Sequence, residues 1–174
     1  MTVPENMLRS VIEISGNAGD ILLSGFRSET TVVSYKSRTD LVTNIDKESE
    51  EYIVSAIRSK FSSHSIVAEE GSGSETDSEF IWYVDPLDAT NNYAHGIPFF
   101  CVSIGVYSRV EKGIVCGAVF DPCHKEMFHA EKGKGAFCNG VPLKVSGISD
   151  LGVALLATGF PYAKDDMERN NVRE

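Results

Sequence analysis

The chain has 174 residues, of which 42% are hydrophobic and 24% charged, and it carries a formal net charge of -9 with a pI near 4.9. This acidic balance argues against nucleic acids and anionic membranes as partners, but it does not exclude a phosphorylated substrate, because divalent cations can reverse the local field. The sequence contains no run of about 18 apolar residues that could span a membrane, and the N-terminus lacks the basic-then-apolar pattern of a signal peptide.

Two amphipathic helices are predicted in the first third of the chain. The apolar periodicity places the first over residues 5–26 and the second over residues 44–60. Thr43, followed three residues later by Asp46, has the pattern of a capping box that opens the second helix. The expected buried face of the first helix consists of Leu8, Val11, Ile12, Ser15, Ala18, Ile21 and Leu22. That of the second consists of Tyr52, Ile53, Ala56, Ile57 and Phe61.

Most of the remaining chain is predicted to form strands. A short strand is expected over residues 31–35, followed by a polar turn over 36–46. Further strands are predicted over 65–70, 80–85, 99–108, 114–120, 126–130, 136–145 and 153–159. Gly113 and the Asn139-Gly140 pair suit hairpin turns, so consecutive strands should run antiparallel. The predicted fold class is therefore α+β, with two N-terminal helices packed on a mostly antiparallel sheet in a layered sandwich.

The last apolar strand is followed by too little chain to cover it. We therefore expect residues 1–174 to form one incomplete domain whose C-terminal part is missing. Within it, residues 1–145 would form the helix pair and the sheet with a metal site, and residues 146–174 would begin a second, truncated α/β half.

Three carboxylates follow the ends of apolar segments and are candidates for a metal site: Glu69, Asp85 and Asp88. An ionised carboxylate at the end of a buried strand is costly unless a cation compensates its charge. Several such groups favour a hard divalent cation, Mg²⁺ above all. Pro86 fixes a turn that lets Asp88 fold back toward Asp85, and the Leu87 carbonyl would supply a further oxygen.

The residues after this turn suit phosphate. Asp88 is a good N-cap for a short helix, whose first amides, at Ala89 and Thr90, would form a cradle for phosphate. With a metal and the Thr90 hydroxyl nearby, the pattern indicates hydrolysis of a phosphate ester by activated water. In the alternative explanation, Asp85 and Asp88 only shape an Asx turn and cap the helix. Glu69, at a second strand end, favours the metal site.

Four segments together resemble the inositol monophosphatase family of Mg²⁺-dependent, lithium-sensitive phosphatases. They are "DLVTNID", "AEE", "WYVDPLDATNNYAHGIPFFCVSIGV" and "GKGAFCNGVPLKVS". "DPLDAT" is similar to the family signature D-P-[IL]-D-G-T. The four segments occur in the family's order and span most of the chain, which makes the resemblance far more specific than one short motif.

The resemblance implies roles for the signature residues. Glu69 would bind metal and help to activate water, and Asp85, the Leu87 carbonyl and Asp88 would supply the other metal-binding oxygens. The Thr90 hydroxyl would assist the nucleophilic water.

It also implies roles for three further positions and a second role for Thr90. The backbone at Ala89 and Thr90 would bind phosphate, Asp46 would lie beside a weaker third metal, and Lys36 would lie near that metal. The alternatives are simple helix capping for Asp46 and a solvated surface lysine for Lys36.

The chain departs from the family pattern at two places. Ala89 replaces the family glycine, which introduces strain if its φ is positive, and Asn91 replaces a usual threonine. The family's C-terminal W-D-x-A-A motif, with an aspartate for the second metal, does not occur, and Trp82 is the only tryptophan.

The expected function is Mg²⁺-dependent hydrolysis of a phosphate monoester, with inositol monophosphate as the first candidate. The alternatives are another small phosphate (fructose bisphosphate, adenosine 3',5'-bisphosphate or histidinol phosphate) and an impaired family member that only binds metal or a partner. The expected partners are a small phosphorylated substrate and, as one possible assembly, a second copy in a homodimer.

Cysteine and histidine residues give no strong motif. The cysteines lie apart in the sequence, which favours free thiols in a reducing cytoplasm. A zinc site from Cys123, His124 and His129 is an alternative whose spacing does not fit the usual zinc motifs. His64 is expected at the surface.

Overall fold

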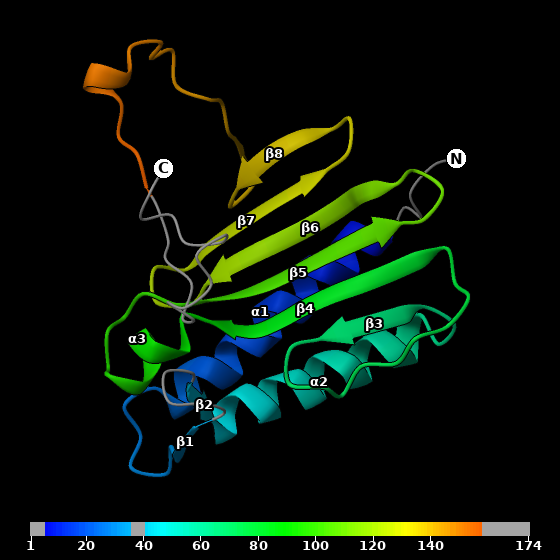
Figure 1. The fold of residues 1–174 in the computed structure, drawn as a ribbon, viewed down its shortest axis with the longest axis vertical. Helices are drawn as coiled ribbons and strands as arrows, with labels where there is room; N and C mark the ends of the chain where they lie inside the picture. The colour runs from blue at the N-terminus through cyan, green and yellow to red at the C-terminus, as the bar shows by residue number, and fades with distance from the viewer. Residues whose placement is uncertain (1–5, 36–40, 158–174) are drawn as a thin grey trace, which may run out of the picture.

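A computed structural model describes residues 6–35 and 41–157 of the protein, without the side chain of Tyr35. Two long helices, α1 (Met7–Gly25) and α2 (Asn44–Lys60), contact each other and pack on the same face of a seven-stranded sheet (Figure 1). A short helix, α3 (Thr90–Ala94), lies between the strands β4 and β5 of that sheet in the sequence.

The large sheet has the strand order β3-β4-β5-β6-β7-β8-β9. Its strands are β3 (Ser65–Ala68), β4 (Phe80–Asp88), β5 (Cys101–Ser108), β6 (Gly113–Asp121), β7 (Glu126–Glu131), β8 (Gly135–Cys138) and β9 (Val141–Pro142). β3 runs parallel to β4, and every other neighbouring pair is antiparallel. Helices on a mixed, mostly antiparallel sheet confirm the predicted α+β class.

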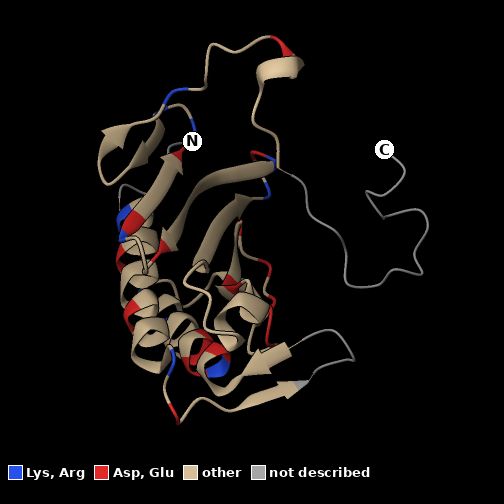
Figure 2. Cartoon of the chain, turned by 90° about the vertical axis from the view of Figure 1, so that its left-hand side faces the viewer, with Lys and Arg blue, Asp and Glu red and all other residues tan. Residues whose placement is uncertain are grey.

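The core lies between the two helices and the sheet. α1 contributes Val11, Ile14, Ala18 and Leu22, all at most 1% exposed and spaced at the helical period. β5 contributes Val102, Ile104 and Val106, which alternate with half-buried residues on the opposite face. Only one face of the sheet is therefore covered by α1 and α2, as the side view shows (Figure 2).

The predicted capping box at the start of α2 is confirmed. The Thr43 hydroxyl accepts hydrogen bonds from the amides of Ile45 and Asp46, and the Asp46 carboxylate accepts one from the Thr43 amide at 2.8 Å. Since both groups satisfy otherwise unpaired donors of the first turn, the helix begins at the predicted residue.

The structure differs from the sequence predictions in four segments. The strand predicted over 80–85, with a turn at Pro86, instead continues through Pro86 to Asp88 as β4. Residues 36–46 were predicted as a turn, but Leu41–Thr43 forms strand β2, which pairs with β1 (Val33–Tyr35). The predicted strand 136–145 is divided at Asn139 into β8 and β9. No strand is present in the described part of 153–159: a 3-10 turn, η1 (Leu151–Val153), is followed by irregular chain to residue 157.

His64 was predicted to lie at the surface, but in the structure it is half-buried. Its Nδ1 accepts a hydrogen bond from Trp82 Nε1 at 3.0 Å, and its ring stacks on Phe61 with ring centroids 5.0 Å apart. Burial lowers the pKa of His64, against an opposing effect from the charge of Glu79. A neutral ring fits this position because the bonded nitrogen must remain an acceptor.

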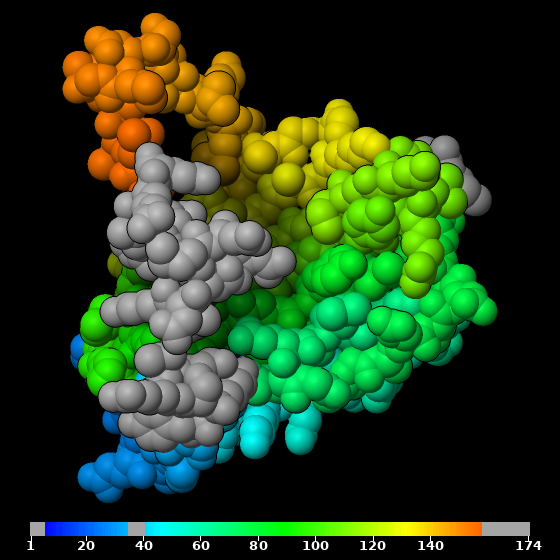
Figure 3. All heavy atoms as spheres, in the orientation of Figure 1, coloured from blue at the N-terminus to red at the C-terminus, as the bar shows by residue number. Residues whose placement is uncertain are grey.

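The sheet face opposite the helices carries several partly exposed apolar side chains. They include Val67, Tyr83, Ile114, Val119 and Phe128, which are 36–53% exposed. In the space-filling view, atoms of the central strands can be seen on the sheet face opposite α1 and α2, so neither helix covers this face (Figure 3). Among the described residues, no helix has the length and apolar character needed to cross a membrane.

Candidate metal centre

Glu69 and Asp85 meet because β3 and β4 are parallel. Ala68, the last residue of β3, pairs with Val84, and the Glu69 amide donates to the Val84 carbonyl at 3.1 Å. Glu69 directly follows β3, and Asp85 lies in β4 next to the last residue that pairs with β3, so the two carboxyl groups lie close enough for Glu69 to raise the pKa of Asp85. The two strand ends that were predicted to carry the site are adjacent in space.

A bulge in β4 directs Asp88 to the same face as Asp85. Residues three apart on a regular strand point to opposite faces. Here Asp85 pairs with Ser103 and Asp88 with Cys101, so β4 has one more residue than β5 over this stretch. Because Ser103 and Cys101 are two apart, on the face away from the helices, the bulge brings both aspartates to that face.

The charge at this edge is poorly compensated. Burial, followed by the neighbouring Glu69 and Asp88 carboxylates, raises the pKa of Asp85 to about 8. The opposing effect is one hydrogen bond, which the Leu87 amide donates to Asp85 Oδ1 at 3.2 Å. Near neutral pH the pair therefore retains a proton unless a cation takes its place.

Asp88 does not cap α3, contrary to prediction. The N-cap of this helix is Ala89, with φ 69° and ψ 44°, and no side chain caps it. The Asp88 side chain is exposed and accepts a hydrogen bond from Cys101 Sγ at 3.7 Å. Burial, followed by the charges of Asp88 and Asp85, raises the pKa of the Cys101 thiol to about 12, so it stays protonated beside them.

A second cluster joins α2 to the end of β4 and the start of α3. The Thr90 hydroxyl donates to the Leu87 carbonyl at 3.0 Å and to Asp46 Oδ1 at 3.2 Å, so its one proton is shared between two acceptors. Asp46 is 1% exposed, and burial raises its pKa against the opposing hydrogen bonds from Thr43 and Thr90. Asp46 therefore caps α2 with one oxygen and contacts the predicted site with the other.

The donor set fits a hard divalent cation only in part. Carboxylate and carbonyl oxygens are the ligands that Mg²⁺ takes. However, among the described residues no group of three His, Cys, Asp or Glu side chains is arranged so that it could hold a metal ion. The carboxyl groups near one another are those of Glu69, Asp85 and Asp88, and the Leu87 carbonyl accepts a hydrogen bond from Thr90.

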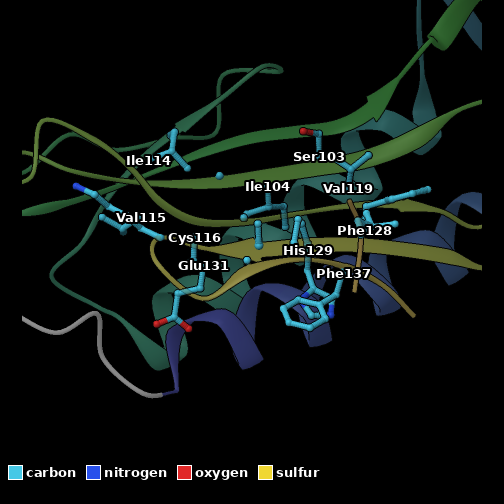
Figure 4. Close-up of a pocket in the computed structure, with 18 of the residues that line it drawn as sticks. Ser103, Ile104, Ile114, Val115, Cys116, Val119, Phe128, His129, Glu131 and Phe137 are labelled. Atoms are coloured by element: carbon cyan, nitrogen blue, oxygen red, sulfur yellow. The ribbon is translucent and has the colours of Figure 1, made fainter. Parts of the chain in front are cut away.

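Two grooves lie on the sheet near these groups. Glu69 and Asp85 line the smaller one, of 350 Å³, together with Ser103 and Gly105. The larger groove, of 740 Å³, extends from Ser103 and Gly105 over β6 to β8 and is mostly apolar (Figure 4). The two carboxylates thus line the smaller groove and not the larger one.

Sequence reasoning missed Ser49 and Glu50, two buried polar residues of α2. Ser49 Oγ donates to the Pro86 carbonyl at 3.1 Å, and Glu50 accepts hydrogen bonds from the turn that follows Glu69. Their spacing contained a signal: Glu50 lies four residues after Asp46 and three before Ile53, on the apolar face of the helix.

Two other predictions about sites have different outcomes. Lys36 lies outside the described residues. The alternative zinc site is not assembled, because His124 bonds to Asp121 at 2.8 Å, whereas His129 stacks on Phe137 with ring centroids 5.4 Å apart.

Comparison with known proteins identifies relatives along almost the whole chain. A model described as "Inositol monophosphatase family" matches residues 4–173. Inositol monophosphatase 3 of Solanum lycopersicum is 43% identical over 167 residues, which cover 94% of this chain and 61% of that protein. The Nus factor SuhB of Pasteurella multocida is 40% identical over 158 residues, which cover 90% of this chain and 58% of that protein.

Solved structures agree with these relatives. The inositol monophosphatase of Anabaena (Nostoc) sp. PCC 7120 matches with a TM-score of 0.81 and 38% identity, over 97% of this chain and 60% of that one. A structure described as IMPase/NADP phosphatase complexed with Mg²⁺ and phosphate matches with a TM-score of 0.63 and 27% identity, over 72% of this chain and 48% of that one. The chain spans 61% and 58% of the two curated relatives. It belongs to the inositol monophosphatase family.

Proposed function

We propose that this protein hydrolyses a phosphate monoester in a Mg²⁺-dependent reaction, with inositol monophosphate as the first candidate substrate. The observation that carries the proposal is the Glu69–Asp85 carboxyl pair, which the parallel pairing of β3 with β4 brings together. Burial and mutual repulsion make this pair costly as two anions, and a divalent cation would supply the missing positive charge.

The metal would be held by Glu69, Asp85 and the Leu87 carbonyl, with Asp88 and Asp46 as ligands of further metal ions. For the Leu87 carbonyl to take part, it would share its lone pairs with the Thr90 hydroxyl. When bound, Mg²⁺ would neutralise phosphate charge and activate water.

The chain's own groups would position that water. The Thr90 oxygen retains acceptor capacity while its proton is directed at Leu87 and Asp46. It can therefore accept a hydrogen bond from the attacking water, and Glu69 would remove the proton of this water as general base. The phosphate would be bound by the backbone at Ala89 and Thr90, and Glu69, Leu87 and Asp88 would border the same substrate site.

The relatives support this assignment without extending it to a substrate. One curated relative is named Inositol monophosphatase 3, and one solved neighbour is described with Mg²⁺ and phosphate. A small phosphorylated molecule is accordingly the partner we propose.

Phosphate release from inositol monophosphate, measured with Mg²⁺ and with EDTA, tests the proposal. We expect release only with Mg²⁺, and a loss of at least about 100-fold in Asp85→Asn. Asp77→Asn is a matched control, since it removes the same charge from an exposed loop residue. Equal release by both variants would contradict the proposal. Parallel assays with fructose bisphosphate, adenosine 3',5'-bisphosphate and histidinol phosphate would identify a different substrate.

A second candidate is a non-catalytic role as a metal-binding or partner-binding protein. One observation favours it: a relative named as a Nus factor is 40% identical. Metal binding without release from any of these esters would support this candidate.

A further inference from the structure

We propose that Glu50 is a positioning residue of the metal centre: its buried carboxylate fixes the turn that carries Glu69. The inference rests on the proposed function, since it concerns the same metal. It adds a residue of α2 that the family resemblance did not assign.

The contacts of Glu50 all go to one turn. Glu50 is only 1% exposed, and its Oε2 accepts a hydrogen bond from the Glu70 amide at 2.6 Å. Oε1 accepts from the Ser72 amide at 2.9 Å and from the Ser72 hydroxyl at 2.7 Å. Both carboxylate oxygens are therefore used on the residues directly after Glu69.

These contacts fix the backbone on the far side of Glu69. The Glu70 amide belongs to the same peptide group as the Glu69 carbonyl, so Glu50 holds the orientation of that group. On the near side, the Glu69 amide is bonded to the Val84 carbonyl of β4 at 3.1 Å. With both flanking peptide groups held, the Glu69 side chain starts from a defined backbone position beside Asp85.

The turn needs this support because it departs sharply from the strand. Gly71 has φ 93°, in the left-handed region, and its amide donates to the Ala68 carbonyl at 3.3 Å. Arg58 contributes from α2 by donating to the Ser72 carbonyl at 3.2 Å. Without acceptors from α2, the amides of Glu70 and Ser72 would have to find other partners.

The hydrogen bonds of Glu50 explain how its carboxylate can lie on the apolar face of α2. Three hydrogen bonds reach it from two backbone amides and a hydroxyl, so its buried oxygens have partners in the turn. One turn earlier, Asp46 contacts Thr90 at 3.2 Å. The same rigid helix thus spaces the Glu69 turn and the loop after β4 relative to each other, which a metal shared between them requires.

The test is Mn²⁺ binding to the full chain, measured by electron paramagnetic resonance of free Mn²⁺ on folded samples. In Glu50→Gln, one oxygen becomes an NH₂ group that faces an amide donor, so the turn loses part of its support. We expect a Kd for Mn²⁺ roughly ten-fold weaker than in the wild type. Glu51→Gln, the same change at the exposed neighbouring residue, should bind like the wild type.

A merely structural role gives a different result. Glu50→Gln would then unfold more easily in EDTA but bind Mn²⁺ like the wild type once folded, and this outcome would overturn the inference. If Glu50→Gln does not fold, Ser72→Ala replaces it, since it removes one of the three hydrogen bonds. Ser72→Ala should then weaken Mn²⁺ binding, and wild-type affinity would overturn the inference.

The same experiment separates this inference from the proposed function. Asp85→Asn should bind Mn²⁺ far more weakly than the wild type. If the two bind alike, the metal centre itself is wrong and the inference falls with it. If Asp85→Asn binds weakly but Glu50→Gln does not, only the inference is overturned.

Discussion

Ala89 adopts a backbone conformation that alanine normally avoids. Its φ of 69° lies in the left-handed region, at the residue where the family signature has glycine. The sequence predicts this strain conditionally, because the substitution is visible but the sign of φ is not. The strain falls on the peptide that would border the phosphate, between β4 and α3.

Replacing Ala89 by glycine should therefore stabilise the fold. Left-handed alanine costs about 1–2 kcal/mol, and part of the gain is lost to the greater entropy of unfolded glycine. We expect Ala89→Gly to raise the free energy of unfolding by about 0.5–1 kcal/mol in urea titrations. Ala94→Gly, in the same helix but without a positive φ, should lower it instead, and a loss in Ala89→Gly would contradict the geometry.

The His64–Trp82 pair should make stability pH-dependent. Burial lowers the pKa of His64 in the folded protein, so between the folded and unfolded pKa values the unfolded chain binds more protons. The contribution of His64 to the free energy of unfolding is thus complete above its pKa in the unfolded chain, about 6.5. This contribution decreases as the pH falls below that value.

This dependence is measured by unfolding at about pH 7.5 and about pH 5.5, with Trp82 fluorescence as the signal. His64→Asn keeps an acceptor for the Trp82 Nε1–H but does not titrate. The loss on acidification should be smaller in this variant than in the wild type. An equal loss would show that other groups cause the dependence.

At the scale of elements, local signals were enough for the helices but not for the features that complete the site. The capping box of Thr43 and Asp46 gave the start of α2 because it involves neighbouring residues. The bulge between Asp85 and Asp88 depends on pairing with β5, and β2 is only three residues long, so neither leaves a local pattern. Glu50 was missed because its donors lie 20 and 22 residues away.

Helix α1 lies close to the sheet where it carries glycine. A Cβ on Gly19 would overlap two ring atoms of Phe120 and lie 3.2 Å from Pro122 Cβ. A Cβ on Gly16, one turn earlier, would meet only Met127 Cε, at 3.9 Å. The two glycines thus share a helix but differ in the space above them.

Alanine substitutions at these glycines should have opposite effects. Gly16→Ala gains helix propensity and should raise the free energy of unfolding by about 0.5–1 kcal/mol. In Gly19→Ala the cost of overpacking, about 1–3 kcal/mol, exceeds that gain, so stability should fall. Thermal unfolding of both variants checks this, and similar shifts in Tm would show that α1 is not held closely against β6.

At the scale of the whole molecule, the sequence predicted that helices pack on a sheet, but not which apolar side chains of the sheet would remain exposed. The face away from the helices carries Val119 and Phe128, 40% and 36% exposed, and the segment after β9 exposes Leu155 at 99%. Strand order decides that exposure, and strand order is not local. The division into residues 1–145 and 146–174, the homodimer, the absence of nucleic-acid partners and the cytoplasmic location stay predictions.

The carboxyl pair could be predicted at this scale because each member follows an apolar strand. That Glu69 and Asp85 are adjacent, however, depends on the single parallel pairing in the sheet, between β3 and β4. An antiparallel β3 would have placed the two groups at opposite edges. The proposed metal centre would therefore depend on topology as much as on the signature residues.

The most direct test is anomalous diffraction from crystals of this chain soaked in Mn²⁺, an ion that takes the same oxygen ligands as Mg²⁺. The account predicts an anomalous peak bridged by the carboxylates of Glu69 and Asp85, with the Leu87 carbonyl oriented toward it. Density that shows these two side chains apart, or Mn²⁺ bound elsewhere while the pair stays protonated, would contradict it.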